Sequence, residues 1–199
     1  MSRKTLGLII VLLILTIILV MVAILTKPQK PQQISTTDPT PTPTPLVPGR
    51  TSLSLTPNPL SVSGSTSSTL DIAIDTGGNE VRSVQLEIAY DPKAITNVTL
   101  KPGTFFTNPS VLPIGGVNPN SGRVTYALVP NSSNESRSGT GIVATMTFTP
   151  LLTSTNPKTE ISLLEKSLVS GEARGQNVLI KTTGTTIILK NPTVTTTSQ

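Results

Sequence analysis

Apolar and polar residues alternate along much of the chain between residues 50 and 190. In the segment VRSVQLEIAY, the polar residues Ser83, Gln85 and Glu87 occupy every second position and apolar residues stand between them. Successive side chains of a β-strand point to opposite faces, so this period predicts a strand with one buried face. Similar segments occur near residues 53–55, 70–74, 124–128, 142–148, 160–164, 178–181 and 185–189. About eight or nine short strands with no helical period between them predict an all-β fold, an antiparallel sandwich of two sheets.

The alternation also assigns individual side chains to the inner face of each strand. In the first clear strand the inward residues are Leu70, Ile72 and Ile74, with Asp71 and Asp75 outward. The other inward rows are Val84, Leu86, Ile88 and Tyr90; Val124, Tyr126 and Leu128; and Ile142, Ala144, Met146 and Phe148. We expect these rows to form the core between the two sheets.

A run of twenty residues from Leu6 to Leu25 carries no charge. A helix of that length covers roughly the 30 Å hydrocarbon thickness of a bilayer. The residues that follow, TKPQKPQQI, lack the small side chains of a signal-peptidase site. The sequence therefore predicts an uncleaved transmembrane signal anchor at residues 6–26, after a short cytoplasmic tail at residues 1–5.

Residues 27–49 are rich in Pro, Thr and Gln, with the run DPTPTPTPLVP at their centre. Alternate prolines fix φ and remove amide donors, which favours extended polyproline II. We expect a stalk here, a β-domain over residues 50–190, and a disordered tail over residues 191–199. With the free amino terminus adding positive charge before the span, the predicted orientation is a single pass of the cell membrane with the C-terminal domain outside.

The amino-acid composition limits the functions that the chain can have. The net charge is +5, but four of the fifteen basic residues flank the apolar run, and the rest of the chain has no basic cluster, which argues against nucleic-acid binding. Cysteine and histidine are absent, so thiol and imidazole catalysis and their metal sites are excluded. The carboxylates are scattered without a catalytic or calcium-loop spacing. We predict no enzyme activity, no catalytic residues, no metal site and no cofactor.

One long segment resembles a known family. The chain reads VQLEIAYDPKAITNVTLKPGTFF and later NPNSGRVTYALVP and SGTGIVATMTFTPL. In order and spacing, this resembles the cohesin domains of cellulosome scaffolds and the related superfamily of carbohydrate-binding modules. The resemblance implies a nine-stranded jelly-roll β-sandwich.

Four residues of this segment are expected to shape turns. Tyr90 ends an inward row, so its ring can cap the core. Asp91 and Pro92 then break the strand, Pro by fixing φ and Asp by accepting hydrogen bonds from nearby backbone. Gly103 follows Lys101 and Pro102 in a predicted turn and is expected to supply a positive φ.

The resemblance implies a binding surface. Cohesins hold a partner domain, the dockerin, against one sheet face, using outward residues of the strand that ends in the YDP-like motif. In many members the positions seven and five residues before the Tyr carry Asn and Asp; here they are Ser83 and Gln85, and Glu87 lies on the same face. These three are the candidate partner-binding residues. The expected function is a membrane-anchored, surface-displayed, non-catalytic module that captures a dockerin-like protein, with a possible link to polysaccharide binding or degradation.

Two alternatives stay open. The superfamily includes sugar-binding modules, which stack sugar rings on exposed aromatics. This chain has no Trp and only two Tyr, both on inward rows, so the glycan alternative depends on Phe105 and Phe106 being exposed beside the Gly103 turn. The other alternative is a component of an envelope or appendage assembly.

Overall fold

The computed structural model describes residues 13–17, 21, 47–132, 134–151, 157–172 and 176–190. The chain divides into two units, Met1–Pro43 and Thr44–Gln199. In the first unit, residues 13–17 and 21 are helical, and the rest of the predicted span at residues 6–26 lies outside the described residues. Among the residues that are described, no helix is long and apolar enough to cross a membrane. The predicted stalk at residues 27–49, apart from residues 47–49, and the predicted tail at residues 191–199 also lie outside them.

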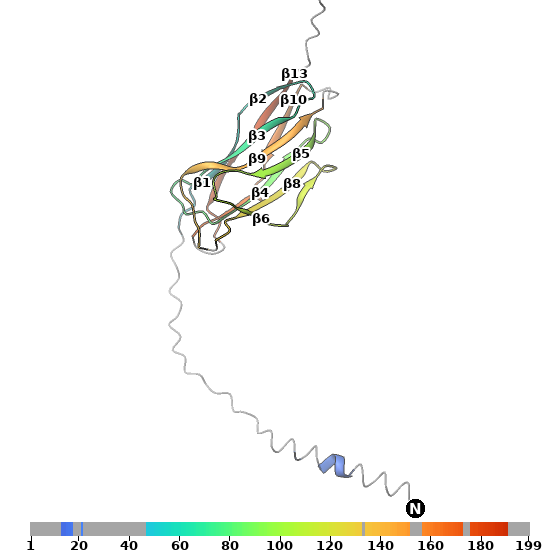
Figure 1. The fold of residues 1–199 in the computed structure, drawn as a ribbon, viewed down its shortest axis with the longest axis vertical. Coiled ribbons are helices and arrows are strands. Elements are labelled where there is room, and N and C mark those ends of the chain that lie inside the picture. The colour runs from blue at the N-terminus through green and yellow to red at the C-terminus, as the bar shows by residue number, and fades with distance from the viewer. Residues whose placement is uncertain are drawn as a thin grey trace, which may run out of the picture. The chain divides into compact units, whose positions relative to one another are not determined.

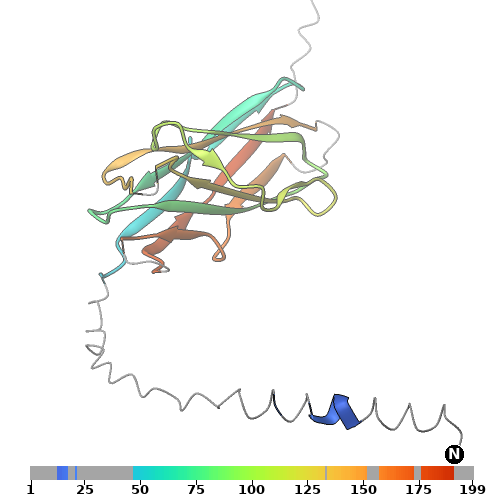
Figure 2. The ribbon, with the colours of Figure 1, turned by 60° about the horizontal axis from the view of Figure 1, so that its bottom comes forward.

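The second unit is a sandwich of two β-sheets (Figures 1 and 2). The five-stranded sheet has the order β12-β1-β3-β9-β5. Its strands are β1 (Thr51–Thr56), β3 (Ser68–Asp75), β5 (Ile95–Pro102), β9 (Thr140–Pro150) and β12 (Leu179–Thr183). The predicted β-sandwich is confirmed.

The eight-stranded sheet has the order β2-β13-β10-β4-β8-β6, with β11 also paired to β4 and β7 to β8. Its strands are β2 (Leu60–Ser63), β4 (Ser83–Tyr90), β6 (Ser110–Val111), β7 (Gly116–Asn118), β8 (Arg123–Val129), β10 (Lys158–Leu163), β11 (Leu168–Ser170) and β13 (Thr185–Lys190). The described residues thus form thirteen strands where the resemblance implied nine. β6, β7 and β11 have two or three residues each, too few for an alternating pattern to show.

Two strand pairs are parallel, which corrects the expectation of a purely antiparallel sandwich. β1 runs parallel to β12, and β2 runs parallel to β13. Each pair joins a strand from the start of the domain to one from its end, so the two ends of the domain close onto each other. Hydrophobic alternation predicts strands and their faces but is the same for parallel and antiparallel neighbours.

The core lies between the sheets and contains the inward rows that the alternation assigned to β3 and β4. The side chains of Leu70, Ile72 and Ile74 are buried in β3. In β4, Val84, Leu86, Ile88 and Tyr90 are buried while the residues between them are half-buried. Both predicted rows are confirmed.

β9 departs from the expected alternation at one position. The register between β3 and β9 shifts so that Ile72 pairs with Ala144 and Ala73 pairs with Ile142. Val143 is the extra residue of this bulge; it is buried, and Ile142 is half-buried. The expectation that Ile142 shares the inner face with Ala144 is therefore wrong, because a bulge adds one residue to a strand and breaks its period of two.

The turn after β4 is held by Asp91. Its backbone oxygen accepts hydrogen bonds from the amides of Ala94 and Ile95, and its Oδ1 accepts one from the amide of Lys93 at 2.9 Å. Gly122 faces the start of this turn at φ +62°, and a Cβ there would lie 2.0 Å from the backbone oxygen of Tyr90. Only glycine fits at that position.

Gly103 has a different role from the one expected. Lys101 and Pro102 are the last residues of β5, not a turn, and Gly103 is not among the residues with positive φ. A Cβ on Gly103 would lie 2.2 Å from the backbone oxygen of Ile142. The glycine is required by the close approach of this segment to the bulged part of β9, where the Gly103 amide donates to the Val143 oxygen at 2.8 Å.

We expect Leu86→Ala to lower the free energy of unfolding by about 2–5 kcal/mol, because it opens a cavity in the centre of the core. Urea denaturation followed by circular dichroism measures the change. The neighbouring outward variant Gln85→Lys is the control and should change the free energy by no more than about 0.5 kcal/mol. A loss well under 1 kcal/mol for Leu86→Ala would contradict the inward assignment of this row.

Candidate partner-binding surface

The three candidate residues lie on the outward row of β4. Ser83, Gln85 and Glu87 are half-buried and alternate with the core residues of the strand. β4 lies inside its sheet, with β8 on one side and with β10 and β11 on the other. Gln85 is opposite Ala127 in β8 and Leu168 in β11. The outward row is thus the middle of a sheet face.

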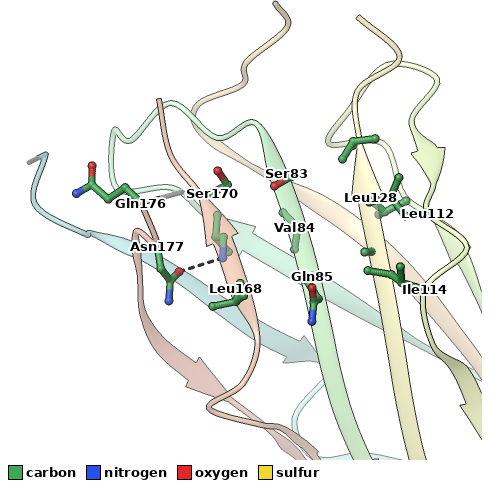
Figure 3. A pocket seen from close by; sticks show the side chains of 13 residues that line it. Ser83, Val84, Gln85, Leu112, Ile114, Leu128, Leu168, Ser170, Gln176 and Asn177 are labelled. Atoms are coloured by element: carbon green, nitrogen blue, oxygen red, sulfur yellow. Dashed lines mark hydrogen bonds between the residues drawn. The ribbon is translucent and has the colours of Figure 1, made fainter. Parts of the chain in front are cut away.

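An apolar hollow lies over the first part of this row (Figure 3). Ser83 and Gln85 lie between Leu168 on β11 and the pair Leu112 and Ile114, which belong to the segment after β6. These three aliphatic side chains are 46%, 36% and 43% exposed, respectively. The hollow is also lined by Val84, Ala127, Leu128, Val129, Val169, Ser170, Gln176 and Asn177. We call this set the β4 hollow.

Hydrogen bonds from backbone amides fix both walls of the β4 hollow. On one side, the amide of Leu112 donates to the oxygen of Ala127 at 2.9 Å, which ties the segment after β6 to β8. On the other side, Asn177 Oδ1 accepts hydrogen bonds from the amides of Val169 and Leu179, each at 3.1 Å. The exposed aliphatic side chains are therefore carried by ordered backbone.

Glu87 lies next to the β4 hollow and is held by two side chains. Its Oε1 accepts a hydrogen bond from Gln85 Nε2 at 2.9 Å, and its Oε2 accepts one from Thr125 Oγ1 at 2.8 Å. Its backbone amide donates to Ser167 Oγ at 3.0 Å. The structure thus brings Ser83 and Gln85 into the hollow and links Glu87 to it through Gln85.

A second depression adjoins the far side of Glu87. Thr125, which donates to Glu87, lines it together with Arg123 and the β7 residues Gly116 and Val117. Gly115, which also lines it, has φ +70°, and a Cβ there would lie 2.4 Å from the Cβ of Thr125. The glycine lets the segment between β6 and β7 approach β8 closely.

The exposed aliphatic residues Leu112, Ile114 and Leu168, which we call the aliphatic wall of the β4 hollow, were not predicted from the sequence. Leu112, Ile114 and Leu168 belong to segments without alternation, so the pattern gave them no face. A signal for Leu112 and Ile114 was present in SVLPIGGVN, where apolar residues stand on both sides of a Pro and before two glycines, in a stretch too irregular to bury them. Exposed apolar clusters of this kind mark interaction sites more often than isolated exposed residues do.

Phe105 and Phe106 are buried, with 7% and 3% of their surfaces exposed. Their ring centroids are 4.9 Å apart in an edge-to-face arrangement. The expectation that they are exposed beside Gly103 is wrong, because the chain after β5 turns inward and continues to hydrogen-bond to β9 through the Phe105 amide and the Ile142 oxygen. Their rings are not available to stack against a sugar.

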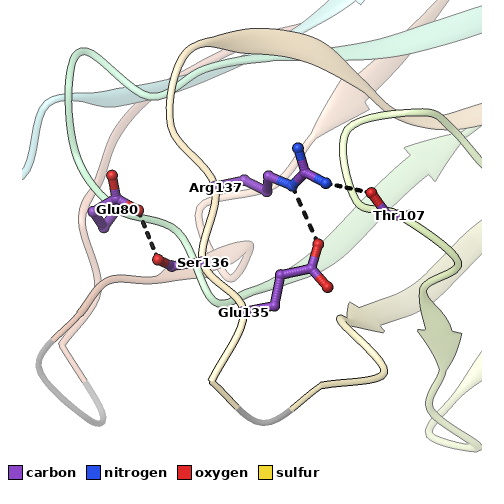
Figure 4. A network of polar contacts seen from close by, with 5 residues as sticks. All are labelled: Glu80, Thr107, Glu135, Ser136 and Arg137. Carbon is purple, nitrogen blue, oxygen red and sulfur yellow. Dashed lines mark hydrogen bonds and ion pairs between the residues drawn. The ribbon is translucent and has the colours of Figure 1, made fainter.

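A polar cluster outside the β4 hollow joins three loops (Figure 4). Ser136 Oγ donates to Glu80 Oε2 at 2.7 Å, and Arg137 Nε lies 3.2 Å from Glu135 Oε1. Arg137 also donates to the hydroxyl of Thr107. Glu80 already accepts a hydrogen bond from another loop, and Glu135 pairs with Arg137 of its own loop, so this cluster fits a structural role.

Burial changes the acidity of both tyrosines. It raises the pKa of Tyr90 and the pKa of Tyr126, because the phenolate form would be desolvated. The hydroxyl of Tyr126 is buried and has no hydrogen-bond partner within the described part of the chain.

Comparison with known proteins identifies the family. The model of the cohesin domain matches residues 62–189. The chain belongs to the cohesin domain family. The match runs from within β2 to within β13, and so includes all strands that carry the β4 hollow. A search of curated proteins gives no match.

Solved cohesins share the fold of this cohesin at low sequence identity. The cohesin CaCohA2 from Clostridium acetobutylicum is 16% identical, with a TM-score of 0.59 over 72% of this chain and 92% of that one. A non-cellulosomal cohesin from the archaeon Archaeoglobus fulgidus is 16% identical, with a TM-score of 0.55 over 71% and 92%. The sixth cohesin of scaffoldin B from Acetivibrio cellulolyticus, solved with a Cel5 dockerin, is 16% identical, with a TM-score of 0.57 over 70% and 99%.

We expect Tyr126→Phe to leave the free energy of unfolding at pH 7 unchanged or to raise it by up to about 1 kcal/mol, because it removes a buried hydroxyl without a partner. In the original protein, stability should fall as the pH rises above 10, since the unfolded chain ionises its tyrosines before the folded chain does. The variant should lose less stability over that range. Urea denaturation at pH 7 and pH 11 tests both points, and a variant that is less stable at both would contradict them.

Proposed function

We propose that this cohesin captures a dockerin-type protein through the β4 hollow and the adjoining Glu87. The single observation that carries the proposal is the cluster of exposed aliphatic side chains, Leu112, Ile114 and Leu168, around the outward row of β4. A sheet face with an apolar centre and a polar border has the character of a protein interface.

The relatives support the choice of partner. Three solved cohesins of this fold are described in complexes: CaCohA2 with CaDoc0917, OlpA with Doc918 from Clostridium thermocellum, and the sixth cohesin of scaffoldin B with a Cel5 dockerin. The candidate residues Ser83 and Gln85, which the family resemblance indicates, line the β4 hollow. Fold-level similarity and the local surface therefore favour the same strand.

Direct glycan binding is less well supported. Its platform depended on Phe105 and Phe106, and both are buried. The proposed role is binding without catalysis, and a link to polysaccharide breakdown would come from the partner that the module holds.

We further propose that residues 6–26 anchor this module in the cell membrane, with the amino terminus in the cytoplasm. The support is the uncharged apolar run from Leu6 to Leu25, followed by the Pro/Thr-rich residues 27–49. A stalk of 23 residues extended at about 3.1 Å per residue would hold the cohesin some 70 Å from the bilayer. The module would then be displayed on the outside of the cell.

A charged side chain placed in the aliphatic wall tests whether this surface binds the partner. We expect Ile114→Lys in the full chain to weaken dockerin binding at least about tenfold, measured by isothermal titration calorimetry in detergent, because it places a charge in the apolar centre. Ile180→Lys is the matched control, since Ile180 is 67% exposed on β12 of the other sheet. Equal effects of the two substitutions would contradict the assignment of the surface.

Cell fractionation tests the anchor. We expect the full chain to stay in the membrane pellet after carbonate extraction and a variant lacking residues 6–26 to be released, because only the apolar run provides affinity for the bilayer core. Protease added to intact cells should remove the cohesin from the full chain. A cohesin that is protected until the cells are lysed would contradict the proposed orientation.

A further inference from the structure

Glu87 is a negative charge that forms no ion pair with any described residue. Its carboxylate accepts hydrogen bonds from the Gln85 amide and the Thr125 hydroxyl, and both donors are neutral. Within the part of the chain that the structure describes, no Lys or Arg forms an ion pair with it. The two hydrogen bonds orient the carboxylate, and its full charge remains.

The carboxylate can still accept further hydrogen bonds. An ionised carboxylate offers about four acceptor positions on its two oxygens, and one position on each oxygen is used here. Glu87 is half-buried, so its two bonds hold it in place at the border of the β4 hollow and leave part of it open to solvent. Both orientation and acceptor capacity are present before any partner arrives.

A partner that covers the β4 hollow would also remove water from Glu87. Gln85, which donates to Glu87, lines the hollow itself, and Thr125 lines the second depression. Binding is strongly disfavoured when a charge loses its water without gaining a partner. Docking on this surface is therefore favourable only if the partner supplies a donor, and a cation gives the strongest such bond to a carboxylate.

Arg123 is a cation of this chain that could itself neutralise Glu87, because it lines the same depression as Thr125. It is exposed on β8, opposite Ala89, and lines the second depression. It forms no ion pair with Glu87 among the described residues. If Arg123 neutralised Glu87 on docking, no cation from the partner would be needed, and the test below separates the two cases.

We propose that Glu87 is the specificity-determining anion of the surface: it pairs with a Lys or Arg of a dockerin-type partner whose aliphatic side chains fill the hollow between Leu168 and Ile114. This inference rests on the proposed function and deepens it. It assigns the partner a defined chemistry, a surface with aliphatic residues beside one cation. Dockerins with an acidic residue at that place would be rejected, since two carboxylates would be desolvated together.

The test is a double-mutant cycle between the full chain and dockerin modules of the source organism. Each purified module is titrated into the full chain in detergent, and the tightest binder is kept. Glu87→Gln should then weaken binding about 10- to 100-fold, because it removes the charge and keeps an oxygen that accepts from Thr125. Glu160→Gln is the matched control, since Glu160 is exposed on β10 outside the hollow, and it should leave binding unchanged.

The cycle then identifies the cation. Each Lys and Arg of the dockerin is replaced in turn by Met, and for one of them the effect of Glu87→Gln should fall to less than about twofold. Arg123→Gln should leave the effect of Glu87→Gln intact. If the effect disappears in the Arg123→Gln background, or if no dockerin cation couples to Glu87, the inference is overturned.

The outcomes separate this inference from the proposed function. Failure of every dockerin module to bind the full chain would contradict the proposed function itself. If Ile114→Lys weakens binding and Glu87→Gln does not, the proposed function is retained and only the role of Glu87 is overturned. The thermal unfolding midpoint of Glu87→Gln should stay within about 2 °C of the original, so that lost binding reports charge and not misfolding.

Discussion

Burial of the inward row of β4 holds the candidate surface in place. Val84, Leu86 and Ile88 are each 1% exposed or less and pack between the two sheets. Because side chains alternate along a strand, burying these residues forces Ser83, Gln85 and Glu87 onto the opposite face. A shift of one residue in register would bury three polar side chains and expose the core residues. The free energy gained by burying the core therefore also fixes which side chains lie on the surface.

Close backbone contacts then shape what surrounds this row. At Gly115 the absence of a Cβ lets the segment after β6 lie against Thr125, and the Leu112 amide bonds to Ala127. The same segment carries Leu112 and Ile114, two of the three exposed aliphatic residues of the β4 hollow. Thr125, in turn, donates to Glu87. Strand β8, next to β4, therefore helps to position both the Leu112 and Ile114 side of the hollow and the Glu87 carboxylate.

The sequence predicts the long strands and the candidate row but not the wall of the hollow. The rows of β3 and β4 follow from alternation over eight residues in each strand. The bulge at Val143 and the inward turn that buries Phe105 depend on contacts between segments far apart in the chain, which local periodicity does not contain. Leu112 and Leu168 come to line opposite sides of the same hollow only after folding, so the sequence could indicate them only as apolar residues without an assigned face.

Amide hydrogen–deuterium exchange of the full chain, with and without a bound dockerin, tests the central claim most directly. The account predicts added protection in β4, β8, β11 and residues 110–118, with no change in β1, β3 and β12 of the other sheet. Protection confined to the five-stranded sheet, or to the edge strand β12, would contradict the claim that this cohesin binds its partner through the outward face of β4.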